Sequence, residues 1–308
     1  MKPTHVKSCH SPWPELNYES WKDTLKTLHM WTQIAGKIRL RSMPWQNHSW
    51  HTSLYVTPRG LSTSSIPYQN GLFELEFDFH QHQLVISTTY ESPKQVGLYP
   101  RSVADFYREL LDSLDQLAIR VPIHAAPNEV PESIPFDQNE QDRSYDAQKV
   151  SDYWQVAVQT NNIFQQFRSG FIGKCSPVHF FWGAFDLAVT RFSGRPAPLH
   201  PGEAPNMPKE VMQEAYSHEV SSAGFWPGGD QFPQPAFYSY CYPTPPDFGQ
   251  QKVEPSQAFF SEEMGEFFLL YDEVRKAANP ETMLMKFLQT TYEAAASTGK
   301  WDRKNLER

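Results

Sequence analysis

Apolar residues recur at helical spacing near the start of the chain. From Tyr18 onward they fall every three or four positions, at Trp21, Leu25, Leu28, Trp31, Ile34 and Ile38. This spacing predicts a helix with one apolar stripe that packs against a sheet. A second helix is predicted from Ser102, because Asp105 three residues later gives a pattern that resembles a capping box.

Between these predicted helices, apolar and polar residues alternate. Residues 49–56 alternate, residues 73–79 alternate more regularly, and residues 84–89 predict a strand that returns beside them. A period of two is typical of a strand with one buried and one solvated face. The first part of the chain is therefore predicted to be a helix, antiparallel strands and a second helix.

The same order of patterns begins again later in the chain. Residues 124–146 combine prolines with acidic residues and predict a connector. A gapless shift of 133 positions aligns identical residues, which include Trp21 with Trp154, Thr27 with Thr160, Pro44 with Pro177 and Leu54 with Leu187. We therefore predict an α+β fold made by tandem duplication of a helix, antiparallel strands and helix unit, with pseudo-twofold symmetry. The first repeat is expected at residues 13–123 and the second at residues 147–301.

The second repeat differs from the first by a long insertion at about residues 191–255, which is rich in proline, glycine and aromatic residues. One short helix after Pro208 and one strand over residues 237–242 are predicted within it. A helix that begins at Asn279 and Pro280 is expected to close the repeat. Long irregular segments in compact domains are usually functional, so we expect the insertion to cover a pocket between the repeats.

The composition predicts a folded, acidic protein. Of the 308 residues, 39% are hydrophobic and 14% aromatic, which excludes a wholly disordered chain. The net charge of -8 argues against nucleic acid as a partner. The longest nearly uncharged apolar run, residues 178–189, is shorter than the roughly 20 residues of a membrane helix, so no membrane association is expected. Because no signal-like run is present and Cys9, Cys175 and Cys241 form no CxxC pair, a reduced cytoplasmic location is expected.

Candidate chemistry gathers in the insertion at residues 216–230. His218 is the candidate general acid or base, because the pKa of an imidazole suits proton transfer. Glu219 or another carboxylate would orient it, and since adjacent side chains seldom point the same way, Asp186 is the preferred partner. The residues of this segment expected to contact a ligand are Ser221, Ser222 and Trp226. The alternative interpretation is a rigid turn in which these side chains satisfy backbone groups.

A second group of candidates lies on or beside the apolar run at residues 178–189. His179 and Asp186 are the strongly polar residues within it, and a buried carboxylate must find a partner or shift its pKa. The alternative is a satisfied core histidine and an aspartate at a strand bend. Arg191 and Arg195 follow the run and could hold an anionic group of a ligand, although surface arginines usually only solvate an edge.

Metal binding is a weaker alternative. His48 and His51 lie three residues apart, and His179 or His218 would have to complete the site. Residues three apart in a strand face opposite sides, so a hydrogen-bonding role is favoured for both. No motif typical of nucleotide-binding or zinc enzymes is present, and no cofactor is expected.

Four runs of residues carry a resemblance to a known family. They are NHSWH at 47–51, GKCSPVHFFWG at 173–183, DLAVTRFSGR at 186–195 and YSHEVSSAGFWPG at 216–228. These runs are similar to the signature stretches of a bacterial family known as a domain of unknown function, and the likeness covers about residues 13–301. The resemblance implies a stand-alone bacterial cytosolic protein and assigns no activity, cofactor or catalytic residue.

Together these patterns favour a small-molecule site beneath the insertion, with an anionic ligand as one option. If the site is catalytic, His218 is the expected acid or base. The alternative is a non-catalytic binding module or a protein-interaction module in which the aromatic residues are purely structural.

Overall fold

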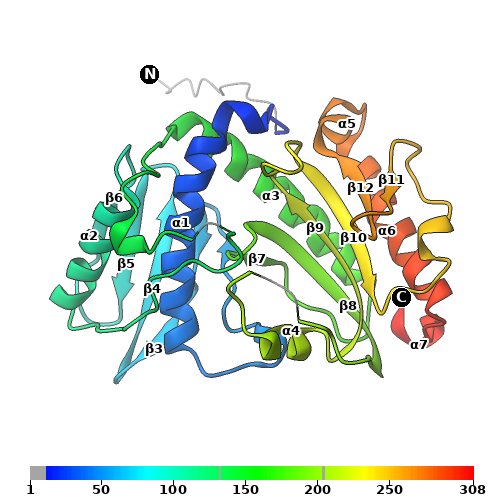
Figure 1. Cartoon of the computed structure of the whole chain (residues 1–308), viewed down its shortest axis with the longest axis horizontal. Coiled ribbons are helices and arrows are strands. Elements are labelled where there is room, and N and C mark those ends of the chain that lie inside the picture. The colour runs from blue at the N-terminus through cyan, green and yellow to red at the C-terminus, as the bar shows by residue number, and fades with distance from the viewer. Residues whose placement is uncertain (1–11, 132, 203–204) are drawn as a thin grey trace, which may run out of the picture.

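Two antiparallel sheets lie side by side and carry the helices of the fold (Figure 1). The computed structural model describes residues 12–131, 133–202 and 205–308, and in this part of the chain each sheet has six strands. The combination of helices with antiparallel sheets confirms the predicted α+β class.

The first sheet has the strand order β1-β2-β4-β5-β6, and β3 also pairs with β4. Its strands are β1 (Tyr55–Val56), β2 (Gly60–Ser62), β3 (Ile66–Tyr68), β4 (Gly71–Asp78), β5 (Gln83–Thr88) and β6 (Lys94–Gly97). Helices α1 (Tyr18–Ser42) and α2 (Val103–Gln116) pack with it. As predicted, the Ser102 side chain caps α2 by accepting a hydrogen bond from the N–H of Asp105.

The second sheet has the order β11-β12-β10-β9-β8-β7. Its strands are β7 (His179–Phe181), β8 (Asp186–Pro196), β9 (His218–Trp226), β10 (Ala236–Tyr242), β11 (Phe259–Ser261) and β12 (Glu266–Leu270). The helices of this half are α3 (Ala147–Ser169), α4 (Lys209–Ala215), α5 (Tyr271–Lys276), α6 (Pro280–Thr298) and α7 (Arg303–Leu306). Three 3-10 turns, η1 (Asn47–Ser49), η2 (Phe136–Gln138) and η3 (Phe248–Gln250), complete the elements. Helices α3 and α6 cover one face of this sheet and leave part of the other face for a site.

The two sheets meet edge to edge. Leu54, just before β1, and Phe180 in β7 exchange both backbone hydrogen bonds at 2.9 Å. Helix α1 also joins the halves, since the ring of Trp31 stacks on Phe106 of α2 at 4.7 Å and Trp21 stacks on Tyr153 of α3 at 5.2 Å. The sheets therefore abut as a rigid pair.

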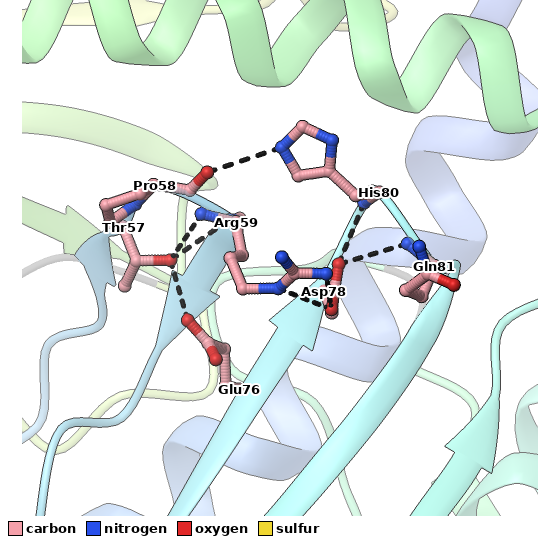
Figure 2. A network of polar contacts seen from close by, with 8 residues as sticks. Thr57, Pro58, Arg59, Glu76, Asp78, His80 and Gln81 are labelled. Carbon is pink, nitrogen blue, oxygen red and sulfur yellow. Dashed lines mark hydrogen bonds and ion pairs between the residues drawn. The ribbon is translucent and has the colours of Figure 1, made fainter.

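A polar network joins the first sheet to α3 (Figure 2). The Arg59 guanidinium donates to Asp78, whose other carboxylate oxygen accepts the N–H groups of His80 and Gln81 at 2.9 and 3.0 Å. The ring of His80 lies 4.7 Å from that of Trp154 on α3, and the Trp154 indole donates to the carbonyl of Thr57. Arg59 and His80 therefore have structural roles in this network.

The strand predicted over residues 49–56 was mostly wrong. Only β1 is strand there, because His48 and Ser49 have φ values of 59° and 57°, a left-handed backbone that ends an extended segment. The apolar run at residues 178–189 forms the β7–β8 hairpin, and Phe185 at φ 59° lies in its turn.

The insertion predicted at about residues 191–255 contributes two complete strands to the second sheet. β9 and β10 lie in its middle, between β8 and β12. The strand predicted at residues 237–242 and the short helix after Pro208 are both confirmed, as β10 and α4. β9 was interpreted as a loop because Ser221, Ser222 and Gly224 have little preference for strands. The helix–strands–helix order recurs in both halves, whereas the tandem duplication, its symmetry and its domain boundaries stay predictions.

Two further expectations concern thiols and membranes. Cys175 and Cys241 are free, and Cys9 lies outside the described residues. Within those residues, every helix is too short or too polar to cross a bilayer.

The contact between α1 and Trp182 predicts an unusual response to Gly36→Ala. Alanine normally stabilises a helix interior by roughly 1 kcal/mol relative to glycine. A methyl group at Gly36 would overlap the indole of Trp182, so we expect a loss of about 1–3 kcal/mol in the free energy of unfolding. The control is Gly170→Ala, whose methyl would lie 3.7 Å from its nearest neighbour. Equal effects of the two substitutions in urea unfolding would contradict the tight packing.

The network in Figure 2 predicts an acid-dependent role for Asp78. Burial opposes its ionisation, yet the Gln81 N–H, Arg59 and the His80 N–H hold the pKa of Asp78 below its usual value. A carboxylate with a depressed pKa stabilises the fold above its unfolded-state pKa and loses that contribution as the pH falls through its folded-state pKa. Asp78→Asn should therefore cost about 1–3 kcal/mol at pH 7 and much less near pH 3. A cost that does not change with pH in chemical unfolding would refute this role.

Candidate functional site

A cavity of about 530 Å³ lies on the face of the second sheet that α3 and α6 leave free. Alternate residues of the strands form its floor, since side chains at even positions of β8, β9 and β10 share one face. These floor residues are Asp186, Ala188, Thr190, Phe192, Val220, Ser222, Tyr238 and Tyr240. A larger hollow of about 810 Å³ beside α2 is more open, and its Arg101 and Asp105 already form ion pairs, so the enclosed cavity is the better candidate.

The walls of the cavity come from segments far apart in the sequence. Three groups of residues contribute: Trp45, His48, Ser49, Trp50 and Thr52 around η1; Asn128 and Glu129 of the connector with Phe181, Trp182, Gly183 and Ala184 of the β7–β8 hairpin; and Val211, Met212, Ala215 and Tyr216 at α4. Val211, Met212 and Ala215 of α4 therefore face the cavity. The lining is mainly aromatic and aliphatic, with a few polar groups, as is typical of small-molecule sites.

Helix α4 closes the cavity on one side and is fastened to η1. The His48 imidazole donates from Nδ1 to the carbonyls of Glu214 and Ala215, at 3.2 and 3.1 Å. The Trp45 indole donates to the Glu214 carboxylate at 2.9 Å. These bonds hold the last turn of α4 against η1. His48 therefore has a structural task.

Asp186 is the most buried carboxylate of the floor. Its Oδ2 accepts a short hydrogen bond from the hydroxyl of Tyr238 on β10, two strands away. The phenol crosses β9 at Gly224, where a methyl group would overlap its ring. Burial raises the pKa of Asp186 to about 6, although the Tyr238 bond opposes the rise.

A row of hydroxyls continues the floor beyond Asp186. Thr190 and Ser222 hydrogen bond at 2.9 Å, and the phenols of Tyr216 and Tyr240 hydrogen bond at 2.8 Å. Ser222 lies opposite Tyr240 in the strand register, so the two pairs adjoin. Each hydroxyl can donate or accept, so this row can match ligands of either hydrogen-bonding character.

Glu129 reaches the cavity from the connector. The backbone of Asn128 is clamped by the side chain of Gln33 on α1, through bonds of 2.8 and 2.9 Å. Glu129 itself has φ 58°, a left-handed conformation that is costly outside glycine and often marks a functional position. Its carboxylate lies against Gly183, where a methyl group would overlap it.

The Glu129 carboxylate has no hydrogen-bond donor among the described residues. Burial, and secondly the charge of Asp186, raise the pKa of Glu129 to about 7. Glu266 on β12 behaves alike, since burial and then the Asp186 charge raise its pKa to about 7. The described lining contains no lysine or arginine that could neutralise these groups. The cavity is thus electrostatically negative whenever its carboxylates are ionised.

Lys174 lies behind His48 and outside the lining. Its ammonium donates to Nε2 of His48 at 2.6 Å and lies 5.2 Å from the ring centre of Trp50. Burial lowers the pKa of Lys174, and burial together with the Lys174 charge lowers that of His48. A neutral His48 is consistent with its donation to α4 from Nδ1 and acceptance at Nε2.

Of the predicted residues, Asp186, Ser222 and His48 line the cavity, and the others lie outside its lining. His218 lies beside His48, with ring centres 6.0 Å apart, but its Nδ1 bonds to Ser217 and it does not line the cavity. Glu219 forms an ion pair with Arg195 at 2.6 Å. That pair leaves neither group directed at a ligand in the cavity.

The remaining predicted residues lie elsewhere in the fold. Arg191 and Ser221 occupy odd positions, and the Arg191 guanidinium is packed between the rings of Phe167 and Tyr292 on the helical side of the sheet. Trp226 stacks on Phe232. His179 is fully buried; neither ring nitrogen has a partner among the described residues, and burial lowers its pKa to about 3.

The two histidines considered as metal ligands do not converge. His48 bonds to α4 and Lys174, whereas His51 accepts the N–H of Gln46 at 3.2 Å. In the described ranges, no group of three or more histidine, cysteine, aspartate or glutamate side chains is placed to hold a metal ion.

Sequence reasoning missed Glu129 and the two tyrosines of the floor, Tyr238 and Tyr240. Glu129 lies in a stretch interpreted as a passive connector. Tyr238, Tyr240 and Tyr242 alternate with small residues in the predicted strand 237–242, and this alternation was the available signal that three phenols share one face.

The fold and cavity define an α+β protein with a partly enclosed cavity that is lined by aromatic rings and carboxyl groups. The chain belongs to a family of unknown function, DUF5996, whose model matches residues 13–308. This confirms the membership suggested by the sequence runs, while the bacterial source stays a prediction. No curated protein and no solved structure shows significant similarity to the chain.

The hydrogen bond between Tyr238 and Asp186 predicts a pH-dependent effect of Tyr238→Phe. The folded-state pKa of Asp186, about 6, exceeds the usual 3.8, so stability falls as the pH rises through this window, where the unfolded chain has already released its proton. The variant removes the bond that favours ionisation and should lose about 1–3 kcal/mol at pH 8 but less at pH 5. Chemical unfolding at both pH values measures this. Tyr242→Phe, whose hydroxyl bonds only to the Pro198 carbonyl, is the control, and a similar pH dependence in both variants would argue against the Asp186 bond.

Proposed function

We propose that this protein binds a small organic molecule in the cavity beneath α4. One observation supports this most directly: a partly enclosed space of about 530 Å³ is lined by aromatic rings and holds two carboxyl groups, the buried Asp186 and the half-buried Glu129. A space of this size suits a drug-sized ligand. A bound molecule would add packing contacts with the aromatic lining and could supply hydrogen-bond donors to the carboxyl groups.

The geometry supports a role for the floor and connector more strongly than one for His218. Proton transfer by His218 requires its ring to reach the bound molecule, whereas His48 and η1 lie along the wall nearest to it. The proposal therefore assigns ligand contacts to Asp186, Glu129, Ser222 and Tyr240. An anionic ligand becomes less favourable, because Arg191 packs on Phe167 and Arg195 pairs with Glu219.

A second candidate function is acid–base catalysis on the bound molecule. It is favoured by the pKa values of Asp186 and Glu129, about 6 and 7, because groups that titrate near neutral pH transfer protons most effectively. Time-resolved NMR of each identified ligand tests it. Conversion by the wild-type chain, and its loss in Glu129→Gln at a ligand concentration that saturates the variant, would support catalysis over simple binding.

A fragment screen followed by methyl NMR mapping tests the binding proposal. We expect at least one fragment to shift methyl signals of Val211, Met212 or Ala188, which line the cavity. Val211→Trp should fill the space and weaken such binding by about tenfold or more. Glu210→Trp, on the exposed side of α4, is the matched control and should bind within about twofold of wild type.

Two outcomes would contradict the proposal. The first is that no fragment perturbs a lining methyl group of the folded protein, and the second is that Val211→Trp binds the fragments as well as Glu210→Trp does. Either result would favour the alternative that the aromatic residues are structural.

A further inference from the structure

The charge inventory of the cavity restricts the kind of ligand that it can hold. Asp186 and Glu129 contribute carboxyl groups, and the described lining offers no lysine or arginine in return. His48 is the basic residue of the lining, and its imidazole is occupied by α4 and Lys174. A ligand carboxylate or phosphate would therefore meet like charge without a compensating cation.

The aromatic lining favours the opposite charge. Trp50, Trp182, Tyr238 and Tyr240 line the cavity together with the carboxyl groups. The faces of such rings attract cations, and the attraction grows when water is excluded. The rings and the carboxylates of this cavity therefore both attract a positively charged group of a ligand.

The position of Glu129 adds to this argument. Its carboxylate has no donor among the residues described, and it is held in the cavity by a strained backbone and by the Gln33 clamp. Such strain persists only when surrounding contacts enforce it. Asp186 keeps a donor in Tyr238, so Glu129 has more acceptor capacity left for a ligand.

We propose that the ligand carries a positively charged nitrogen group, such as a protonated amine, held by Glu129 and Asp186 and enclosed by the aromatic walls. This inference rests on the proposed binding function and specifies its ligand class. The positive group pairs with the two carboxylates, while the remainder of the ligand packs on the apolar lining. The row of hydroxyls from Thr190 to Tyr216 serves the polar atoms of that remainder.

Because the carboxyl groups titrate, the affinity for a positively charged ligand should depend on pH. The titratable groups that face Asp186 are Tyr238 of β10, Glu266 of β12, Tyr153 of α3, Tyr216 at the end of α4 and Glu129 of the connector, none of which carries a positive charge. As the pH rises from 5 to 8, Asp186 and Glu129 lose their protons, so the affinity for a cation should increase by about tenfold or more. A neutral ligand should show little change, and an anion should bind less well.

Matched probes test the ligand class. Each set keeps one aromatic group and varies the charge of the group at the end of its side chain, as in 2-phenylethylamine, 2-phenylethanol and 3-phenylpropionate. Corresponding sets built on indole and naphthalene test larger ligands. Ligand-observed NMR titration at pH 5 and pH 8 measures binding to the full chain. We expect the amine to bind about tenfold more tightly than the alcohol at pH 8, and the carboxylate to bind most weakly.

Two variants assign the preference to the carboxyl groups. Glu129→Gln and Asp186→Asn should each reduce the advantage of the amine over the alcohol by about fivefold or more. If Asp186→Asn does not fold, Glu129→Gln alone still shows whether a carboxyl group of the cavity causes the preference for the amine. Glu219→Gln, whose parent side chain pairs with Arg195 away from the cavity, is the control and should retain the full preference.

The outcomes separate this inference from the function on which it rests. Equal binding of amine and alcohol in the cavity, or an amine preference that survives in Glu129→Gln, would overturn the cationic ligand and leave small-molecule binding in place. Absence of binding by every probe at millimolar concentration would overturn both.

Discussion

The placement of two carboxyl groups beside aromatic rings in one cavity is the constraint on which the site depends. Removing an ionised carboxylate from water is costly unless a donor or a cation compensates it. The buried Asp186 receives one donor, the phenol of Tyr238, and the half-buried Glu129 receives none from the described residues. Burial raises the pKa of both groups, so each ionises less readily than a carboxyl group in water.

The fold creates this constraint through the register of the strands in the second sheet and the close approach of Tyr238 to β9. Gly224 leaves room above β9, so the Tyr238 phenol spans it to meet Asp186. The edge contact at Leu54 and Phe180 joins the sheets, and η1 with α4 then closes the space above the second sheet. Helix α1 completes the arrangement from the other half, because Gln33 holds the connector that carries Glu129.

Sequence patterns predicted the long elements well and the site only in part. Strong periodicity and capping residues located α1, α2 and α6, and proline with inward apolar residues located α4. β9 could not be predicted, because its Ser221, Ser222 and Gly224 are favoured by a neighbouring strand and by Tyr238 rather than by intrinsic propensity. Glu129 was missed because its backbone conformation is imposed by Gln33, a contact 95 residues away in the chain that one sequence does not reveal.

A carboxyl NMR titration of the ligand-free protein tests the central claim most directly. Selective carbon labelling, with Asp186→Asn and Glu129→Gln for assignment, follows each group between pH 3 and pH 9. The account predicts that both Asp186 and Glu129 ionise well above the usual range for carboxyl groups, near 6 and 7. Ordinary ionisation of both near pH 4 would show that water or an unrecognised donor already compensates them, and would contradict a cavity that awaits a positive ligand.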